Sequence, residues 1–61
     1  MRSPDAGEYA LKVLEALDEP RTFSELLKVT SLKARELVFA LNELGRKGLI
    51  VKNEYFFERR V

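Results

Sequence analysis

The stretch that decides the fold lies at residues 22–50 and reads Thr22-Phe-Ser-Glu-Leu-Leu-Lys-Val-Thr-Ser-Leu-Lys-Ala-Arg-Glu-Leu-Val-Phe-Ala-Leu-Asn-Glu-Leu-Gly-Arg-Lys-Gly-Leu-Ile50. Thr22 and Glu25 have the spacing of a capping box, in which each side chain accepts a hydrogen bond from the other residue's backbone amide. Apolar residues follow directly, so we expect a short helix over residues 23–29. This helix should bury Leu26 and Phe23.

A longer helix is expected over residues 32–47, after a turn at Thr30-Ser31 in which either residue can serve as the cap. Its apolar positions recur with the helical period, which predicts one buried stripe. Gly48 can adopt the left-handed conformation that commonly ends a helix, and Arg46 suits the negative end of the helix dipole. The residues expected in the buried stripe are Ala34, Leu37, Leu41 and Leu44, with Ala40 beside them.

A first helix is expected over residues 4–18, upstream of the capping box. Ser3-Pro4 has the cap and first-turn residues of a helix start, and the residue before Pro20 avoids the helical region and ends it. Together with Met1, this cap leads us to expect a complete N-terminus. The buried stripe should contain Ala10, Val13, Leu14 and Leu17, widened by Leu11.

A β-hairpin is expected over residues 49–58, because short β-branched and aromatic runs flank a turn at Asn53-Glu54. On the returning strand, Tyr55 and Phe57 should share one face while Phe56 takes the other. The tail from residue 58 onward is expected to fray. The predicted fold is therefore α+β, with three helices followed by a short two-stranded hairpin in one domain, residues 1–61.

The composition argues against catalysis and against a membrane protein. The 61 residues include no His and no Cys, which removes the commonest proton shuttle, the best nucleophile and any thiolate metal site. We therefore expect no enzyme, no catalytic residues, no metal and no cofactor. No apolar run is long enough to span a membrane and none resembles a signal peptide, which predicts a cytoplasmic protein.

Charge is abundant but unevenly distributed along the chain. Charged residues make up 34% of the sequence, and Gln and Trp are absent together with His and Cys, a composition typical of thermophile proteins. Residues 1–30 hold four basic and six acidic residues, whereas residues 31–61 hold seven basic and four acidic residues. The second half is therefore the basic half, and it contains the long helix and the hairpin.

The pattern of Phe23-Ser-Glu-Leu26, Leu32, Leu37, Leu41-Asn-Glu-Leu44 and Lys47-Gly-Leu-Ile50 resembles the winged helix-turn-helix superfamily, specifically MarR/ArsR-type regulators of archaea and bacteria. The resemblance covers residues 8–58. It implies a small archaeal transcriptional regulator that binds double-stranded DNA as a homodimer. In such proteins the third helix enters the major groove and the hairpin, or wing, contacts the backbone or an adjacent groove.

The resemblance also implies a set of DNA-binding residues. Arg35 could recognise a guanine edge and Asn42 an adenine edge, while cations nearby neutralise phosphates. Each of these cations could equally be an ordinary solvated residue in so charged a chain. The full predicted set is Lys33, Arg35, Asn42, Arg46, Lys47, Lys52, Arg59 and Arg60.

Apolar residues on the same helix face leave a second interpretation open. Val38 and Phe39 could pack into the core, form a self-association patch, or dock a partner protein through an aromatic anchor. The alternative function is therefore a winged-helix module for protein–protein interaction. Phe56 is a further candidate interface residue, because a two-faced hairpin leaves one aromatic face without a core. Tyr9 of the first expected helix is another candidate, since it raises the same question.

Overall fold

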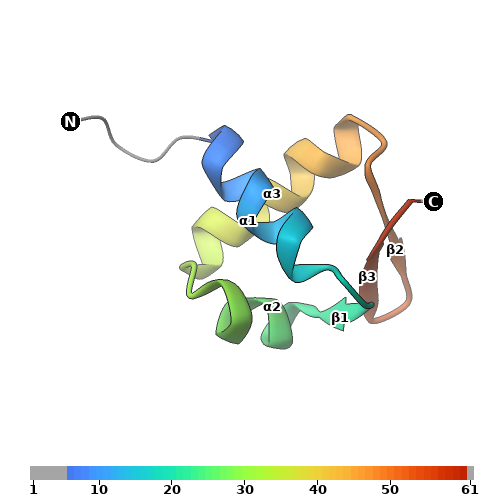
Figure 1. Ribbon diagram of the computed structural model, residues 1–61, viewed down its shortest axis with the longest axis horizontal. Helices are drawn as coiled ribbons and strands as arrows, with labels where there is room; N and C mark the ends of the chain where they lie inside the picture. The colour runs from blue at the N-terminus through green and yellow to red at the C-terminus, as the bar shows by residue number, and fades with distance from the viewer. Residues whose placement is uncertain (1–5, 61) are drawn as a thin grey trace.

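Three helices lie beside one three-stranded antiparallel sheet in the computed structural model, which describes residues 6–60 (Figure 1). The expected α+β class is confirmed. The expected helix start at Ser3-Pro4 lies outside the described residues. The elements are α1 (Ala6–Ala16), β1 (Arg21–Thr22), α2 (Phe23–Thr30), α3 (Ala34–Arg46), β2 (Ile50–Asn53) and β3 (Phe56–Arg59).

The sheet has one strand more than the sequence pattern predicts. Its order is β1-β3-β2, so the hairpin of β2 and β3 is extended by β1, which pairs with the other side of β3. Arg21 lies opposite Phe57, and Thr22 lies opposite Phe56. The prediction of a two-stranded sheet was incomplete because a two-residue strand carries no periodicity of its own. Its pairing fixes the start of α2 against the hairpin.

The hairpin turn lies one residue later than expected. Asn53 pairs with Phe56, so Glu54 and Tyr55 form the turn, and Glu54 has a positive φ of 56°. Tyr55 is therefore not a strand residue, and 77% of it is exposed. Phe57 packs against the core on the inner face of the sheet, whereas Phe56 lies on the outer face.

The end of the chain is held in place as far as residue 60. Glu58 and Arg59 belong to β3, and the Arg60 amide donates a hydrogen bond to the Leu49 carbonyl at 2.9 Å. The expectation of a frayed tail from residue 58 was therefore wrong. The backbone hydrogen bond to Leu49, just before β2, fixes this segment, which the polar sequence alone does not predict.

The hydrophobic core lies where α1 packs across α3 and where α2 and the hairpin close the sides (Figure 1). Two expected core members are exposed instead. Leu11 lies about 100° round the helix from Ala10, and it is 58% exposed. Ala34 is exposed because it is the first residue of α3. The buried apolar residues are Ala10, Val13, Ala16, Leu17, Leu26, Leu32, Leu37, Ala40, Leu41, Leu44 and Ile50.

The capping box at the start of α2 is present as predicted. The Glu25 amide donates to the Thr22 hydroxyl at 3.2 Å, and the Thr22 amide donates to the Glu25 carboxylate at 2.9 Å. At the end of α3, Gly48 adopts the left-handed conformation with φ 73°, as expected. These two local signals fix where the α2–α3 unit begins and ends.

The turn between α2 and α3 is built differently from the expectation. The cap of α3 is Lys33, and neither Thr30 nor Ser31 caps this helix. Thr30 is buried, and its hydroxyl donates to the Leu26 carbonyl at 2.6 Å and accepts from the Leu32 amide at 3.2 Å. Ser31 takes the left-handed conformation that turns the chain from α2 towards α3.

Candidate functional site

The exposed face of α3 gathers five of the predicted site residues. One side of the helix is buried against the core, and the opposite side meets solvent because side chains repeat every 3.6 residues. The structure thus places the base-contact candidates and the two apolar residues together. The residues of this exposed face are Arg35, Val38, Phe39, Asn42 and Arg46.

Val38 and Phe39 are not part of the core. They are 46% and 51% exposed respectively, so neither belongs to the buried core. Val38 borders a hollow between α3 and the hairpin, which Phe23 and Phe57 also line. Phe39 lies further round the helix. Both are left available for contact with something outside the chain.

The hollow beside Val38 connects α3 to the hairpin. Its volume is about 240 Å³, and Asn42 of α3 and Lys52 of β2 both line it. The Lys52 ammonium lies 5.8 Å from the centre of the Phe57 ring, within the range of a cation–π contact. The structure therefore brings Lys52 next to the exposed face of α3. The remaining lining residues are Phe23, Leu41 and Phe57.

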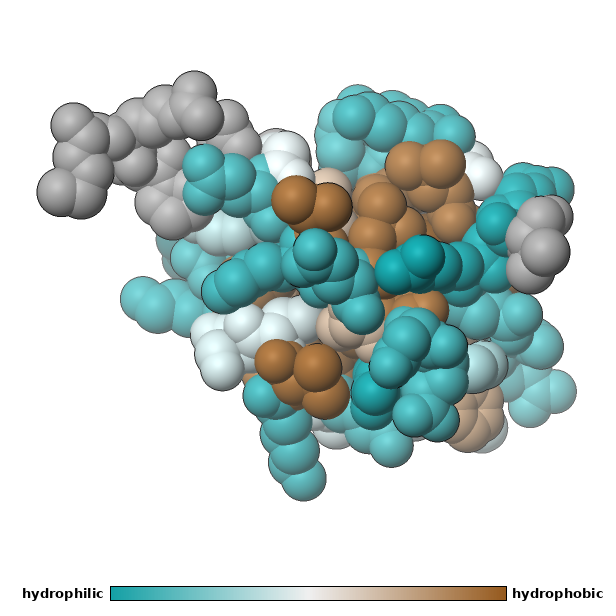
Figure 2. All heavy atoms as spheres, in the orientation of Figure 1, coloured by the Kyte–Doolittle hydropathy of each residue, from teal (hydrophilic) through white to brown (hydrophobic). Residues whose placement is uncertain are grey.

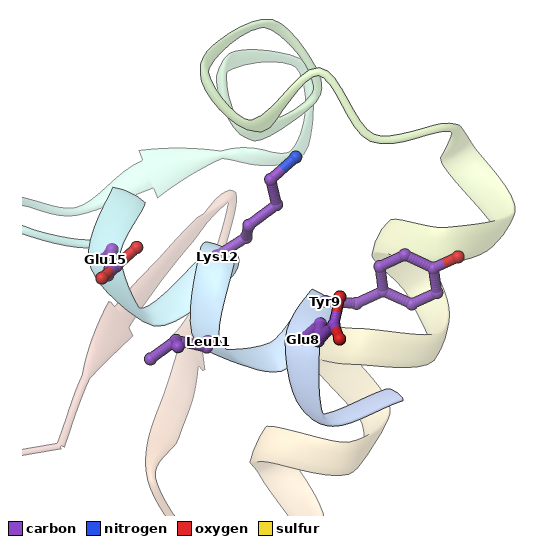
Figure 3. Close-up of a pocket in the computed structure, with 5 residues that line it drawn as sticks. All are labelled: Glu8, Tyr9, Leu11, Lys12 and Glu15. Carbon is purple, nitrogen blue, oxygen red and sulfur yellow. The ribbon is translucent and has the colours of Figure 1, made fainter. Parts of the chain in front are cut away.

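The carboxylate of Glu36 is directed away from this face. One oxygen accepts from the Lys33 amide at 2.9 Å and the other from the Tyr9 hydroxyl of α1 at 3.1 Å. Figure 3 shows the Tyr9 side chain extending from α1 towards the beginning of α3. The Lys33 amide holds the pKa of Glu36 below its ordinary value of 4.5, and the Tyr9 hydroxyl acts in the same direction against partial desolvation. Tyr9, a candidate interface residue, is thus already engaged within the chain.

Charge on the exposed face is mainly positive. Glu43 is paired with Arg46 at 2.7 Å and lies 3.9 Å from the Lys47 ammonium. Arg35, Lys33 and Lys52 have no ion pair within the range 6–60. Of the three, Lys33 also lies close enough to Glu36 for its charge to help lower the pKa of that carboxyl, and Lys52 lies over the Phe57 ring.

The two arginines at the C-terminal end have different surroundings. The Arg59 guanidinium donates through Nε to the Leu14 carbonyl at 2.9 Å, and its Nη2 contacts the same oxygen. It therefore ties β3 to α1, the helix on the buried side of α3. Arg60 follows β3 and has an exposed side chain. The structure separates Arg59 from the α3 face.

Other surfaces contribute less to the site. Phe56 is 45% exposed on the outer face of the sheet, away from the inner face that carries Phe57. Figure 2 shows apolar surface exposed between α1 and the hairpin, surrounded by polar side chains. A further hollow of about 320 Å³ lies along α1 (Figure 3). Its described lining residues are Glu8, Tyr9, Leu11, Lys12 and Glu15.

Metal sites and membrane spans are absent from the part of the chain that the structure describes. No three acidic, His or Cys side chains come close enough there to hold a metal ion. No described helix has the length and apolar character needed to cross a bilayer.

Sequence reasoning missed the role of Glu36 and the hollow that brings Lys52 beside Asn42. The signal for Glu36 was its position three residues after the cap of α3, the spacing at which a carboxylate reaches back to the cap amide. No comparable signal exists for Lys52, because its place beside Asn42 depends on tertiary packing.

Comparison with known proteins returned no match of any kind. No family model matches the sequence, and neither a curated protein nor a solved structure shows significant similarity to it.

Proposed function

We propose that the protein binds double-stranded DNA by placing the exposed face of α3 in the major groove, and that it acts as a homodimeric transcriptional regulator. The order of three helices and a hairpin is compatible with a winged helix-turn-helix, with β2 and β3 as the wing. The tight turn at Ser31 between α2 and α3 supports this reading. An α-helix of this kind fits the width of the major groove.

The observation that carries the proposal is the grouping of Arg35, Asn42 and Arg46 on one exposed face of α3. Two nearby carboxylates have partners within the chain. Glu36 is turned towards α1, and Glu43 is paired with Arg46 of the same face and with Lys47. The face therefore presents a guanidinium and an amide, the side chains best suited to guanine and adenine edges.

Other cations would position the protein on the DNA backbone. Lys52 projects from the hairpin beside α3, where it could neutralise a phosphate. Arg59 is the least suited of the predicted residues, because its guanidinium is already bound to Leu14. The proposed backbone contacts are Lys33, Arg46, Lys47, Lys52 and Arg60.

A fluorescence anisotropy titration of labelled random-sequence duplex across a salt series tests the proposal. The logarithm of the binding constant should fall linearly with the logarithm of salt concentration, for specific and nonspecific binding alike, because each phosphate contact releases counterions. Arg35→Ala should weaken binding and relax preference at one base pair. Lys52→Ala is the matched comparison, since loss of a phosphate contact should lower the salt slope by about one without altering base preference.

Two results would count against this function. No binding at low salt and tens of micromolar protein would remove it altogether, since nonspecific affinities are about 10⁻⁴–10⁻⁶ M at physiological salt. Unchanged affinity and preference in Arg35→Ala would remove the groove assignment. Sedimentation velocity tests the dimer separately, and a dimer should bind half-sites about 34 Å apart.

A second candidate function is favoured by the exposure of Val38 and Phe39. An exposed aromatic with an apolar neighbour is the usual centre of a protein–protein interface, and both residues are about half exposed. In this case Phe39→Asp should dissociate the complex or the dimer. In the DNA-binding case, folding and oligomeric state should survive this substitution, while the added negative charge weakens duplex binding.

A further inference from the structure

Val38 and Phe39 frame Asn42 on the exposed face of α3, and this combination has a chemical counterpart in one kind of base pair. We propose that this face recognises thymine–adenine pairs, with the two apolar side chains contacting the thymine 5-methyl group and Asn42 bound to adenine. The inference rests on the proposed DNA binding and specifies which sequences that site would take. It also assigns a role to the two residues that the DNA-binding interpretation otherwise leaves unexplained.

The helical spacing places the three side chains next to one another. Asn42 lies four residues after Val38 and three after Phe39, so the Cβ atoms of neighbours on this face are about 5–6 Å apart. All three are exposed, and none lies within the buried stripe of α3. An amide is thus bordered on two sides by apolar surface.

The chemistry of the major groove matches this arrangement at one pair. Adenine offers an acceptor and a donor that an Asn amide can bind bidentately, and its thymine partner carries the only methyl group in the groove. A guanine–cytosine pair has no apolar group there. Binding such a pair would leave the exposed surfaces of Val38 and Phe39 against polar atoms.

The surroundings of this cluster favour DNA as the occupant. Arg35 and Arg46 lie on the same exposed face, with Arg46 paired to Glu43, and Lys52 lines the same hollow as Val38 and Asn42. A polyanion would therefore meet cations around an apolar and amide centre. The hollow leaves open space on the hairpin side of Val38.

Replacement of thymine by uracil tests the inference directly. The tightest-binding duplex is first selected from a random pool and then synthesised in two versions, with thymine or with deoxyuridine throughout. The two versions keep the same pairing and the same charge, and they differ only in the methyl groups. Anisotropy should show affinity for the uracil version lower by about four-fold for each methyl group contacted.

Variants identify the source of the difference. Phe39→Ala should narrow the difference in affinity between the two versions, and the double variant Val38→Ala/Phe39→Ala should abolish it, whereas Phe39→Leu should keep it because leucine remains apolar. Phe56→Ala is the matched control: this phenylalanine is 45% exposed on the outer sheet face, and its loss should leave the discrimination intact. Circular dichroism confirms that each variant is folded.

The outcomes separate this inference from the function on which it rests. Equal affinity for the two versions, or a selected sequence without thymine–adenine pairs, overturns methyl recognition while DNA binding stands. Absence of binding to every duplex overturns both. A thymine preference that persists unchanged in the double variant Val38→Ala/Phe39→Ala would overturn the assignment to these side chains.

Discussion

Ser31 illustrates how a single residue can fix the relation of two helices at an energetic cost. It caps α2 with φ 60° and ψ 19°, the left-handed conformation that glycine adopts without strain. Its side chain is exposed, and the turn depends on its amide, which donates to the Leu27 carbonyl at 3.1 Å. Glycine would preserve that hydrogen bond and remove the strain.

We therefore expect Ser31→Gly to stabilise the protein, in urea denaturation, by about 0.5–1 kcal/mol, the left-handed penalty less the entropy of an added glycine. The same substitution at Ser24, an exposed residue in the first turn of α2, is the matched control. There it should destabilise, by about 0.5 kcal/mol, because glycine is a poor helix former. A destabilised Ser31→Gly would mean that the hydroxyl contributes more than the backbone strain costs.

Glu36 makes the stability of the α1–α3 contact depend on pH. Its pKa is lowered first by the Lys33 amide and then by the Tyr9 hydroxyl, so the folded chain favours the charged carboxylate. The stabilisation is fully present above the ordinary value of 4.5 and is lost as pH falls through the lower folded pKa. We expect the difference in unfolding free energy between the wild type and Glu36→Gln to shrink as pH falls from 6 through this acidic range.

Denaturant titrations at several pH values measure that difference. Tyr9→Phe keeps the ring but removes one hydrogen bond to the Glu36 carboxylate. The unfolding free energy of this variant should therefore depend on pH less strongly than that of the wild type, but should still depend on it. A difference between wild type and Glu36→Gln that stays constant down to the acid limit of folding would show that the carboxylate is not selectively stabilised in its charged form.

At the scale of elements, local signals predicted the helices and long-range pairing decided the rest. The capping box at Thr22 and the glycine at position 48 set the ends of the α2–α3 unit as expected. The hairpin register was not predictable, because an alternating pattern places Ile50 and Phe57 on the inner face in either register. The observed register continues β3 to Arg59 and lets β1 pair alongside.

The candidate site shows the same division. Helical periodicity was enough to place Arg35, Asn42 and Phe39 on one face of α3. It could not show that Lys52 lies beside Asn42, or that Arg59 is bound to α1, since both facts depend on how the hairpin packs. The exposure of Val38 also depended on tertiary structure, because a wide buried arc on a central helix was equally compatible with the sequence.

Arg59 and Arg60 allow a test of the structural link between β3 and α1. Arg59→Ala removes the hydrogen bonds from β3 to the Leu14 carbonyl, and the loss should destabilise the fold by about 1–2 kcal/mol. Arg60→Ala removes the neighbouring exposed side chain but keeps the backbone bond to Leu49, so thermal unfolding should stay nearly unchanged. Equal losses of stability in the two variants would contradict the link between β3 and α1.

For the whole molecule, a small core leaves little reserve against mutation. A chain of 61 residues has a stability of about 3–9 kcal/mol at the usual stability per residue. Val13, Leu26, Leu37 and Leu44 are almost completely buried, and no disulfide can supplement them because the chain has no Cys. Each of these side chains therefore carries a large share of the total stability.

Leu37→Ala should consequently unfold a large fraction of the protein, because removing a fully buried leucine costs about 2–5 kcal/mol. Leu11→Ala is the control with the same chemical change: Leu11 is 58% exposed on α1, and its loss should alter stability by no more than about 0.5 kcal/mol. Far-UV circular dichroism during thermal unfolding distinguishes the two variants. If Leu11→Ala were as damaging as Leu37→Ala, Leu11 would have to be buried in solution, by a second copy or another partner. Repeating the melts over a range of protein concentrations would identify a second copy, because stability that depends on dimerisation rises with concentration.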